Sequence, residues 1–230
     1  MYHYLEEEID QLRTKVIKMG SLVEEQLGFA IKALLESNIE YAKIVIERDS
    51  KVDKYDIKID KLCQKIFALT QPVANDLRII LSALKINNDL ERIGDISVNI
   101  AERTEPMKDN VQILKEFGLD IMADKVKQMV TKTIDSFVNN DHDLAFNVIK
   151  SDDIIDNLEK EIFNKLIDRM EKDSSIVRPC AHCITLLRHL ERLADHATNI
   201  AEEVVFLVDS KIIKHRKNLD DFEINPKEII

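Results

Sequence analysis

A segment of 13 residues occurs twice in this chain, with an offset of 100 residues. Residues 90–102 and 190–202 are identical at eight of the 13 aligned positions. A weaker match aligns residues 42–59 with residues 145–162 at an offset of 103. The chain is therefore predicted to be a tandem duplication whose halves fold in the same way. A period of about 100 residues is too long for a solenoid repeat, so two fused bundles are the better interpretation.

Each half is predicted to be helical because residues that form turns are scarce. The 230 residues include only four glycines and four prolines, well below the share in an average globular chain. This argues against a loop-rich β-sandwich and against a disordered chain. Apolar residues recur at steps of three and four, as at Leu5, Ile9, Leu12 and Val16, which is typical of an amphipathic helix.

Caps, prolines and polar turns divide the chain into six long helices. The expected helices cover about 5–37, 39–69, 72–105, 114–138, 143–171, and from the Asp173-Ser174-Ser175 cap to about 209. Pro72 and Pro179 are expected in the first turn of their helices, where proline is tolerated. Short connections favour antiparallel neighbours.

The predicted fold is all-α, with two similar three-helix bundles in tandem. The first bundle is expected at residues 1–108 and the second at 109–210, followed by a loosely ordered C-terminal tail at 211–230. A single extended coiled coil is the alternative, but prolines and turns at regular intervals disfavour it.

The composition limits the partners and the compartment. With 33 basic and 43 acidic residues the net charge is −10, which disfavours nucleic-acid binding. No apolar run approaches the roughly 18 residues of a membrane span, and the acidic N-terminus does not look like a signal peptide. Three cysteines, an odd number, favour a reducing cytoplasm over a disulfide framework.

Four of the predicted helices carry a stripe of carboxylates on one face. On a helical wheel, Glu91 and Asp95 lie within about 40° of each other, opposite the apolar face. The same spacing of four residues occurs at Asp49 and Asp53, Glu91 and Asp95, Asp152 and Asp156, and Glu191 and Asp195.

A solvated surface is the ordinary interpretation of an acidic helix face. Here, however, the stripes have one sign, although like charges four residues apart are destabilising by a few tenths of a kcal/mol, and they recur at the same place in both halves. A multivalent cation between neighbouring helices would turn that repulsion into attraction. Carboxylates suit Mg, Ca, Mn or ferric iron, and zinc less often. The alternatives are an acidic groove for a basic partner segment and a face that serves only solubility.

The repeated segments resemble the PhoU family of phosphate-system regulators. The similarity lies in residues 90–102 and 191–202, in Gln71-Pro-Val-Ala-Asn-Asp-Leu-Arg at 71–78, and in Met-Gly-Ser-Leu-Val-Glu-Glu at 19–25. It covers about residues 5–210. The resemblance implies two three-helix bundles and a non-enzymatic, cytoplasmic protein that is peripheral to the inner membrane through its partners. Family members connect the ATPase of an ABC-type phosphate transporter with a sensor histidine kinase, restrain uptake, and hold the phosphate-starvation response off.

The resemblance also implies metal clusters at the acidic motifs. The family's motif, Glu or Asp followed four residues later by Asp, falls on the eight residues of the stripes. Iron or zinc then becomes the preferred metal, with Mg, Mn or Ca as alternatives. Secondary candidates are Asp56, Glu159, Glu102 and Glu202. Phe163 stands where the first half has Asp60, and Arg188 where it has Asn88, so the second site is expected to differ from the first. A homodimer is a further expectation, since exposed apolar positions on long helices often pair.

Other groups of potentially reactive residues give weaker evidence for a functional site. Cys180 and Cys183 form a C-x-x-C pair, but no second ligand group or strand-to-helix context accompanies it, so buried small side chains are expected. A di-iron carboxylate enzyme would need Glu-x-x-His pairs on inward-facing helices, and no Glu stands three residues before any of the six His. No P-loop or nucleophile elbow is present in the sequence. The chain is therefore not expected to be an enzyme.

Overall fold

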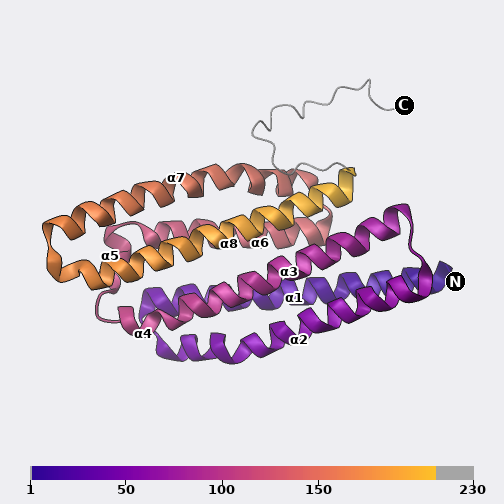
Figure 1. Cartoon of the computed structure of the whole chain (residues 1–230), viewed down its shortest axis with the longest axis horizontal. Helices are drawn as coiled ribbons and strands as arrows, with labels where there is room; N and C mark the ends of the chain where they lie inside the picture. Colours follow the sequence, from indigo (N-terminus) through magenta and orange to yellow (C-terminus); the bar gives the residue numbers. More distant parts are fainter. Residues whose placement is uncertain (1, 211–230) are drawn as a thin grey trace, which may run out of the picture.

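The computed structural model describes residues 2–210, and the predicted tail lies outside the described residues. Six long helices form two antiparallel bundles of three (Figure 1). The first bundle contains α1 (Tyr2–Glu36), α2 (Ile39–Thr70) and α3 (Ala74–Glu102), and the second contains α6 (Leu119–Asn139), α7 (His142–Lys172) and α8 (Val177–Asp209). The connection contains two short helices, α4 (Thr104–Met107) and α5 (Val111–Glu116), and a 3₁₀ turn (Ser174–Ile176) precedes α8. The predicted all-α tandem of three-helix bundles is confirmed.

Apolar stripes build the core, as the steps of three and four predict. Leu12, Val16, Met19 and Val23 of α1 are all buried, at 1% exposure or less. Polar side chains start the helices that follow the turns. Asn38 Oδ1 accepts hydrogen bonds from the backbone N–H groups of Glu40 (3.0 Å) and Tyr41 (3.2 Å), which satisfies two of the free N–H groups at the start of α2.

Three predicted boundaries are wrong by a few residues. Gln71 adopts a left-handed conformation that ends α2, so Pro72 lies in the connection and α3 begins at Ala74. Helix α3 ends at Glu102, where the N–H of Arg103 bonds to Ile100 O. Gly118 has a φ of +81°, which only glycine adopts readily; it separates α5 from α6, so the fourth long helix begins at Leu119 and not at Leu114.

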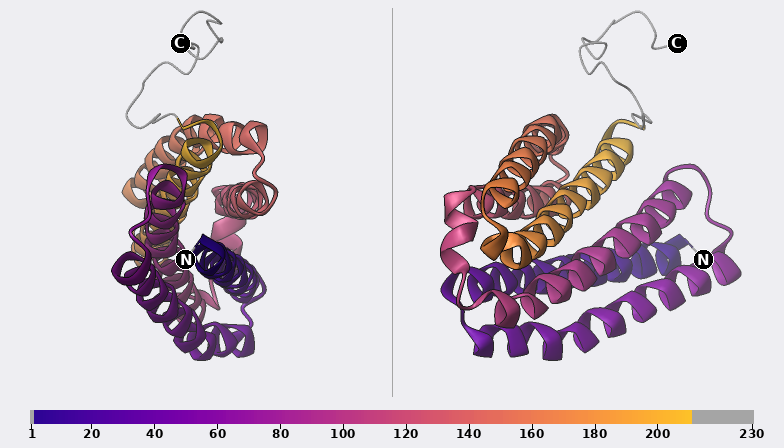
Figure 2. Two further views of the ribbon diagram at one scale, coloured as in Figure 1. Left: turned by 90° about the vertical axis from the view of Figure 1, so that its right-hand side faces the viewer. Right: turned by 60° about the vertical axis from the view of Figure 1, so that its left-hand side comes forward.

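The two bundles pack side by side along two seams, α3 against α8 and α1 against α6 (Figures 1 and 2). In the α3/α8 seam, the buried Glu203 carboxylate accepts hydrogen bonds from Ser82 Oγ (3.1 Å) and Lys85 Nζ (3.0 Å). In the α1/α6 seam, Arg13 donates to Val138 O (3.0 Å) at the end of α6. The arrangement leaves the α2/α3 face of one bundle and the α7/α8 face of the other on the surface. None of the described helices contains a stretch apolar enough to cross a membrane.

Candidate metal centres on the two bundles

The structure gathers the eight predicted carboxylates into two groups. The first carboxylate cluster consists of Asp49 and Asp53 on α2 with Glu91 and Asp95 on α3. The second carboxylate cluster consists of Asp152 and Asp156 on α7 with Glu191 and Asp195 on α8. Each pair is separated by four residues, so its two side chains lie one turn apart on the same helix face.

In the first carboxylate cluster, side chains of the two helices act on each other electrostatically. The pKa of Asp49 is raised, chiefly by burial and further by the charges of Asp53 and Asp95. A hydrogen bond from Gln26 Nε2 to Asp49 Oδ1 (3.0 Å) opposes that rise in pKa. The pKa of Glu91 is also raised, by burial and by Asp95. Carboxylates from α2 and α3 are therefore close enough to repel one another.

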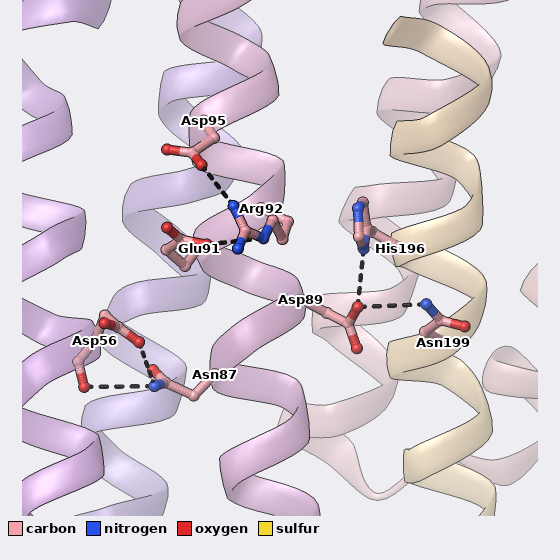
Figure 3. A network of polar contacts seen from close by, with 8 residues as sticks. All are labelled: Asp56, Asn87, Asp89, Glu91, Arg92, Asp95, His196 and Asn199. Atoms are coloured by element: carbon pink, nitrogen blue, oxygen red, sulfur yellow. Dashed lines mark hydrogen bonds and ion pairs between the residues drawn. The ribbon is translucent and has the colours of Figure 1, made fainter. Parts of the chain in front are cut away.

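An arginine partly neutralises the first carboxylate cluster. Arg92 Nε lies 3.4 Å from Glu91 Oε2, and Arg92 Nη1 lies 3.2 Å from Asp95 Oδ2 (Figure 3). The helical wheel places Arg92 beside the acidic stripe, but it does not show that one guanidinium bridges two of the predicted ligands. The bridge depends on rotamers, which the sequence does not reveal.

The acidic surface of the first bundle extends beyond these four residues. Buried Asn87 donates from Nδ2 to Asp56 Oδ1 at 2.6 Å (Figure 3). It also donates to Asp60 Oδ1 at 3.3 Å. The pKa of Asp56 is raised by burial and by Asp60, then by Asp53. Asp56 therefore adjoins the first carboxylate cluster as expected, whereas Glu102 lies about 10 Å along the helix axis beyond Asp95.

The second carboxylate cluster has the stronger electrostatic strain. Burial raises the pKa of Asp152 to about 6, with further contributions from Asp195 and Asp156. Thr198 Oγ1 donates a hydrogen bond to Asp152 Oδ1 (3.3 Å), which only partly offsets the rise. Burial and neighbouring carboxylates also raise the pKa values of Glu191 and Asp195. Within residues 2–210, no arginine is within ion-pair distance of these four carboxylates.

The two side chains that interrupt the second stripe, Phe163 and Arg188, reduce the repulsion between its carboxylates and do not cause it. Phe163 is partly buried against the apolar core, so the position that corresponds to Asp60 contributes no charge. Glu159 does contribute, because its charge helps to raise the pKa of Glu191. Arg188 lowers the pKa of Glu191 electrostatically.

The donor set fits a hard cation, although the side chains do not converge on a single point. Among residues 2–210, no three Asp, Glu, His or Cys side chains come together closely enough to hold an ion without moving. Two amide oxygens beside the first carboxylate cluster, Gln26 Oε1 and Asn87 Oδ1, are buried without a donor in the described structure. A cation at the first carboxylate cluster would require side-chain rotation and release of Arg92.

His196 has a structural role. His196 Nδ1 lies 2.8 Å from Asp89 Oδ1, and Asn199 Nδ2 donates to the same oxygen at 3.3 Å (Figure 3). These contacts join α8 to α3 across the seam between the bundles. Only a contact map could have revealed this pair, because its members are 107 residues apart.

The cysteines are buried, as expected. Cys63, Cys180 and Cys183 are all free thiols. Burial raises the pKa of Cys63 and of Cys183 to about 12. Such thiols are protonated at neutral pH and are poor nucleophiles.

Comparison with known proteins identifies the repeat. A family model described as "PhoU domain" matches residues 16–104 and again residues 119–204. The chain belongs to the PhoU family. Each PhoU domain contains one complete carboxylate cluster, so the duplicated acidic motif and the duplicated domain coincide.

Several PhoU proteins are similar over most of the chain. A "Phosphate-specific transport system accessory protein PhoU homolog" from Zymomonas mobilis is 34% identical over 92% of this chain and 89% of that protein. One with the same description from Aquifex aeolicus is 36% identical over 91% of this chain and 95% of that protein. The crystal structure of PhoU from Pseudomonas aeruginosa is 34% identical, with a TM-score of 0.83, and covers 90% of this chain and 99% of that chain. PhoU from Streptococcus pneumoniae is 26% identical, with a TM-score of 0.81 over 91% and 99% of the two chains.

Proposed function

We propose that this protein is an accessory protein of a phosphate transport system and regulates that system by binding, without catalysing a reaction. The observation that carries the proposal is the similarity over about nine-tenths of the chain to proteins that are named as phosphate-specific transport system accessory proteins. The two-bundle fold, which is shared with PhoU crystal structures, presents long helical surfaces suited to partner binding.

In finer detail, the protein is a negative regulator of phosphate uptake and of the phosphate-starvation response. It couples the ATPase of an ABC-type phosphate transporter to a sensor histidine kinase. In this hypothesis, phosphate status reaches the protein through the conformation of the transporter, and binding biases the kinase toward its phosphatase state. The protein is cytoplasmic and reaches the membrane only through these partners.

Complementation tests the regulatory role. A bacterial strain without its own PhoU protein should express starvation genes in phosphate-rich medium, and this chain should restore repression. A Glu203→Gln variant, altered in the seam between the bundles, is a control that keeps both carboxylate clusters. Failure of the wild-type chain to restore repression, while it binds both purified partners, would contradict the regulatory role.

We further propose that the two carboxylate clusters bind metal ions, with iron or zinc preferred and Mg, Mn or Ca as alternatives. The support is the same in both bundles: carboxylates from two helices that are partly buried and raise one another's pKa. A bound cation would relieve that repulsion. The residues that would hold it are the eight predicted from the stripes.

Elemental analysis of protein purified without chelator or His tag tests the metal sites. The wild type is compared with the variant Asp53→Ala, Asp95→Ala, Asp156→Ala, Asp195→Ala. We expect about one ion or more per chain in the wild type, because carboxylate oxygens are the ligands that hard cations prefer. We expect the variant to lose the ion. Equal metal content in both proteins would contradict the assignment.

The alternative is a metal-free scaffold whose acidic stripes bind Lys- or Arg-rich partner segments. The carboxylates of the second carboxylate cluster, which form no ion pair with an arginine within residues 2–210, favour it. Salt would weaken such binding strongly, because the attraction between the acidic stripes and a basic segment is electrostatic, whereas a chelator would leave it unchanged. Measurement of partner binding with added salt and with added chelator therefore separates the two mechanisms.

A homodimer is also proposed. Exposed apolar side chains on the long helices include Ile46, Ile57, Ile121 and Ile154, and surfaces of this kind can pair. Light scattering of the full chain at several concentrations gives the mass directly. A mass of about 27 kDa at every concentration, equal to that of one 26.6 kDa chain, would contradict the dimer.

A further inference from the structure

Helix α2 has a basic flank as well as an acidic one. On its wheel, Lys51, Lys54 and Lys58 lie roughly opposite Asp49 and Asp53, with the buried core residues between the two flanks. The acidic flank faces α3 and the basic flank faces α1. On the α1 side is an open groove of about 520 Å³.

The lysine groove, as we call it, has basic rims and an apolar floor. Its lining residues are Ile17, Lys18, Ser21, Leu22, Glu25, Lys51, Lys54, Tyr55 and Lys58. Ile17, Leu22 and Tyr55 are partly buried and pack against the core, whereas the four lysines are exposed. Lysines from both helices therefore border a continuous apolar strip.

The positive charge of the groove is not cancelled from within. Glu25 is the single carboxylate among the lining residues, and it is paired with Arg48 at 2.8 Å. Over the described range 2–210, no carboxylate forms an ion pair with Lys18, Lys51 or Lys54. Lys58 Nζ lies over the Tyr55 ring, 5.2 Å from its centroid. The groove is therefore locally positive in a chain whose net charge is −10.

The second bundle shows that the fold does not need these lysines. The corresponding groove between α6 and α7 is smaller, about 130 Å³. At the offset of 103, Lys51, Lys54 and Lys58 correspond to Ile154, Asn157 and Glu161. The same bundle architecture therefore forms with an isoleucine, an asparagine and a glutamate at those positions.

We propose that the lysine groove binds an acidic amphipathic helix of a partner protein. The apolar side of that helix would pack on Ile17, Leu22 and Tyr55, and its Asp and Glu side chains would pair with lysines on both rims, which is the helix-in-groove mode of recognition. The charge complementarity and the apolar floor favour this occupant over free phosphate, because phosphate has no apolar surface that could pack on the apolar strip. The inference is independent of the metal sites and of the regulatory role.

Fluorescence anisotropy with a model ligand tests the groove. The probe is a labelled helical peptide of roughly 18 residues, with Leu at the i, i+3, i+4 and i+7 positions and Glu on the other face. The test variant is Lys51→Glu with Lys54→Glu. The matched control is Lys125→Glu with Lys132→Glu, which changes the net charge equally at the corresponding groove of the second bundle. All four lysines are exposed, and circular dichroism checks that both variants fold.

We expect the test variant to bind the peptide about tenfold more weakly and the control to stay within about twofold of the wild type. The neutral variant Lys51→Gln with Lys54→Gln should fall between them. Salt should weaken wild-type binding steeply. Equal losses in test and control variants would overturn the proposal, since they would report net charge alone.

Two further probes address other ligands. Vesicles of phosphatidylcholine and phosphatidylglycerol present an anionic membrane, and inorganic phosphate presents a free anion. If the vesicles bind in a way that depends on Lys51 and Lys54 while the peptide does not bind, the groove is a membrane contact and the proposal is wrong. If inorganic phosphate displaces the peptide no better than chloride at equal ionic strength, the peptide assignment is supported.

Discussion

The two carboxylate clusters present the same kind of side chain at the same spacing, yet their neighbours differ. In the first, Arg92 bridges Glu91 and Asp95, and Gln26 donates to Asp49. In the second, Thr198 is the one side-chain hydrogen-bond donor to the carboxylates among residues 2–210, and the pKa of Asp152 rises to about 6. The repeat thus preserves the negative charge and varies how it is compensated.

The difference has a thermodynamic meaning. In the first carboxylate cluster, an internal guanidinium already occupies part of the place that a cation would take. In the second, Arg188 and Arg192 act only from a distance, so much of the repulsion is left for a proton, an external cation or a basic group to relieve. We therefore expect the second carboxylate cluster to respond more strongly to metal and to pH.

Removal of one cluster at a time should have the largest effect. The double variant Asp49→Asn, Asp53→Asn should lower metal affinity at the first carboxylate cluster by about 100-fold or more, because it removes ligands whose supporting contacts alone are commonly worth 10- to 100-fold. Asp152→Asn, Asp156→Asn should do the same at the second. Calorimetric titration of metal-free protein with Zn²⁺ or Mn²⁺ would show half of the wild-type stoichiometry in each variant.

Each double variant is the control for the other. If both lose all binding, the two clusters form a single cooperative site and the comparison between them fails. If neither loses any, the carboxylates are not ligands.

Removal of the Arg92 guanidinium should have the opposite effect and raise metal affinity. Arg92→Gln should raise metal affinity at the first carboxylate cluster by about tenfold, or about 1.4 kcal/mol, because the guanidinium no longer competes with the cation for Glu91 and Asp95. The matched change Arg192→Gln should have a smaller effect, since Arg192 only lowers the pKa of Asp195 at a distance. A fall in affinity for Arg92→Gln would mean that the arginine orients the ligands and does not block them.

The strain at Asp152 should be measurable in the metal-free protein. A pKa of about 6 in place of 3.8 corresponds to a loss of folding stability of about 3 kcal/mol at neutral pH. Because the side chain is only partly buried, screening by solvent reduces that loss to about 1 kcal/mol. Asp152→Asn should therefore stabilise the metal-free protein at pH 7 by about 1 kcal/mol in urea unfolding. With saturating metal the sign should reverse, because metal binds the native wild type. Asp49→Asn, whose carboxylate already accepts a bond from Gln26, should stabilise less.

The pH dependence follows from the same shift. The folded pKa of Asp152 lies above its unfolded value, so its contribution to stability is complete below about pH 3.8 and is lost as the pH rises through about 6. The metal-free wild type should lose stability between about pH 4 and 6, and Asp152→Asn should flatten that slope. If stability falls with pH equally steeply in Asp152→Asn, a group other than Asp152 causes the pH dependence.

Much of this organisation is predictable from the sequence because it is periodic. The 13-residue repeat predicts the duplication, the apolar steps predict the helices, and the spacing of four residues places Asp49 and Asp53 on one face. The Asn38 cap of α2 is equally local, because its side chain bonds to the backbone N–H groups two and three residues further along the chain.

The unpredicted features depend on packing or on single backbone angles. The Asp89–His196 contact joins helices of different bundles, and the Arg92 bridge depends on rotamers. Pro72 would fit the first turn of a helix, but the left-handed Gln71 before it places Pro72 in the connection. No periodic pattern contains this information.

The smallest expected effect concerns the closeness of the helices behind each cluster. A Cβ on Gly94 would lie 3.2 Å from Val52 Cγ1 and 3.7 Å from Asp49 Oδ1, whereas the corresponding residue of the second bundle is the buried Ala194. Ala194→Gly should cost about 1 kcal/mol in urea unfolding, the usual penalty for glycine within a helix. Gly94→Ala should stabilise the protein by less than that, because Val52 must move by a few tenths of an ångström.

A double-mutant cycle tests this explanation. Replacement of the neighbouring side chain by Val52→Ala should make the Gly94→Ala change more favourable than it is in the wild type. A full gain of about 1 kcal/mol for Gly94→Ala alone would show that α2 and α3 are not held closer than α7 and α8, and that the two clusters differ only in their polar neighbours.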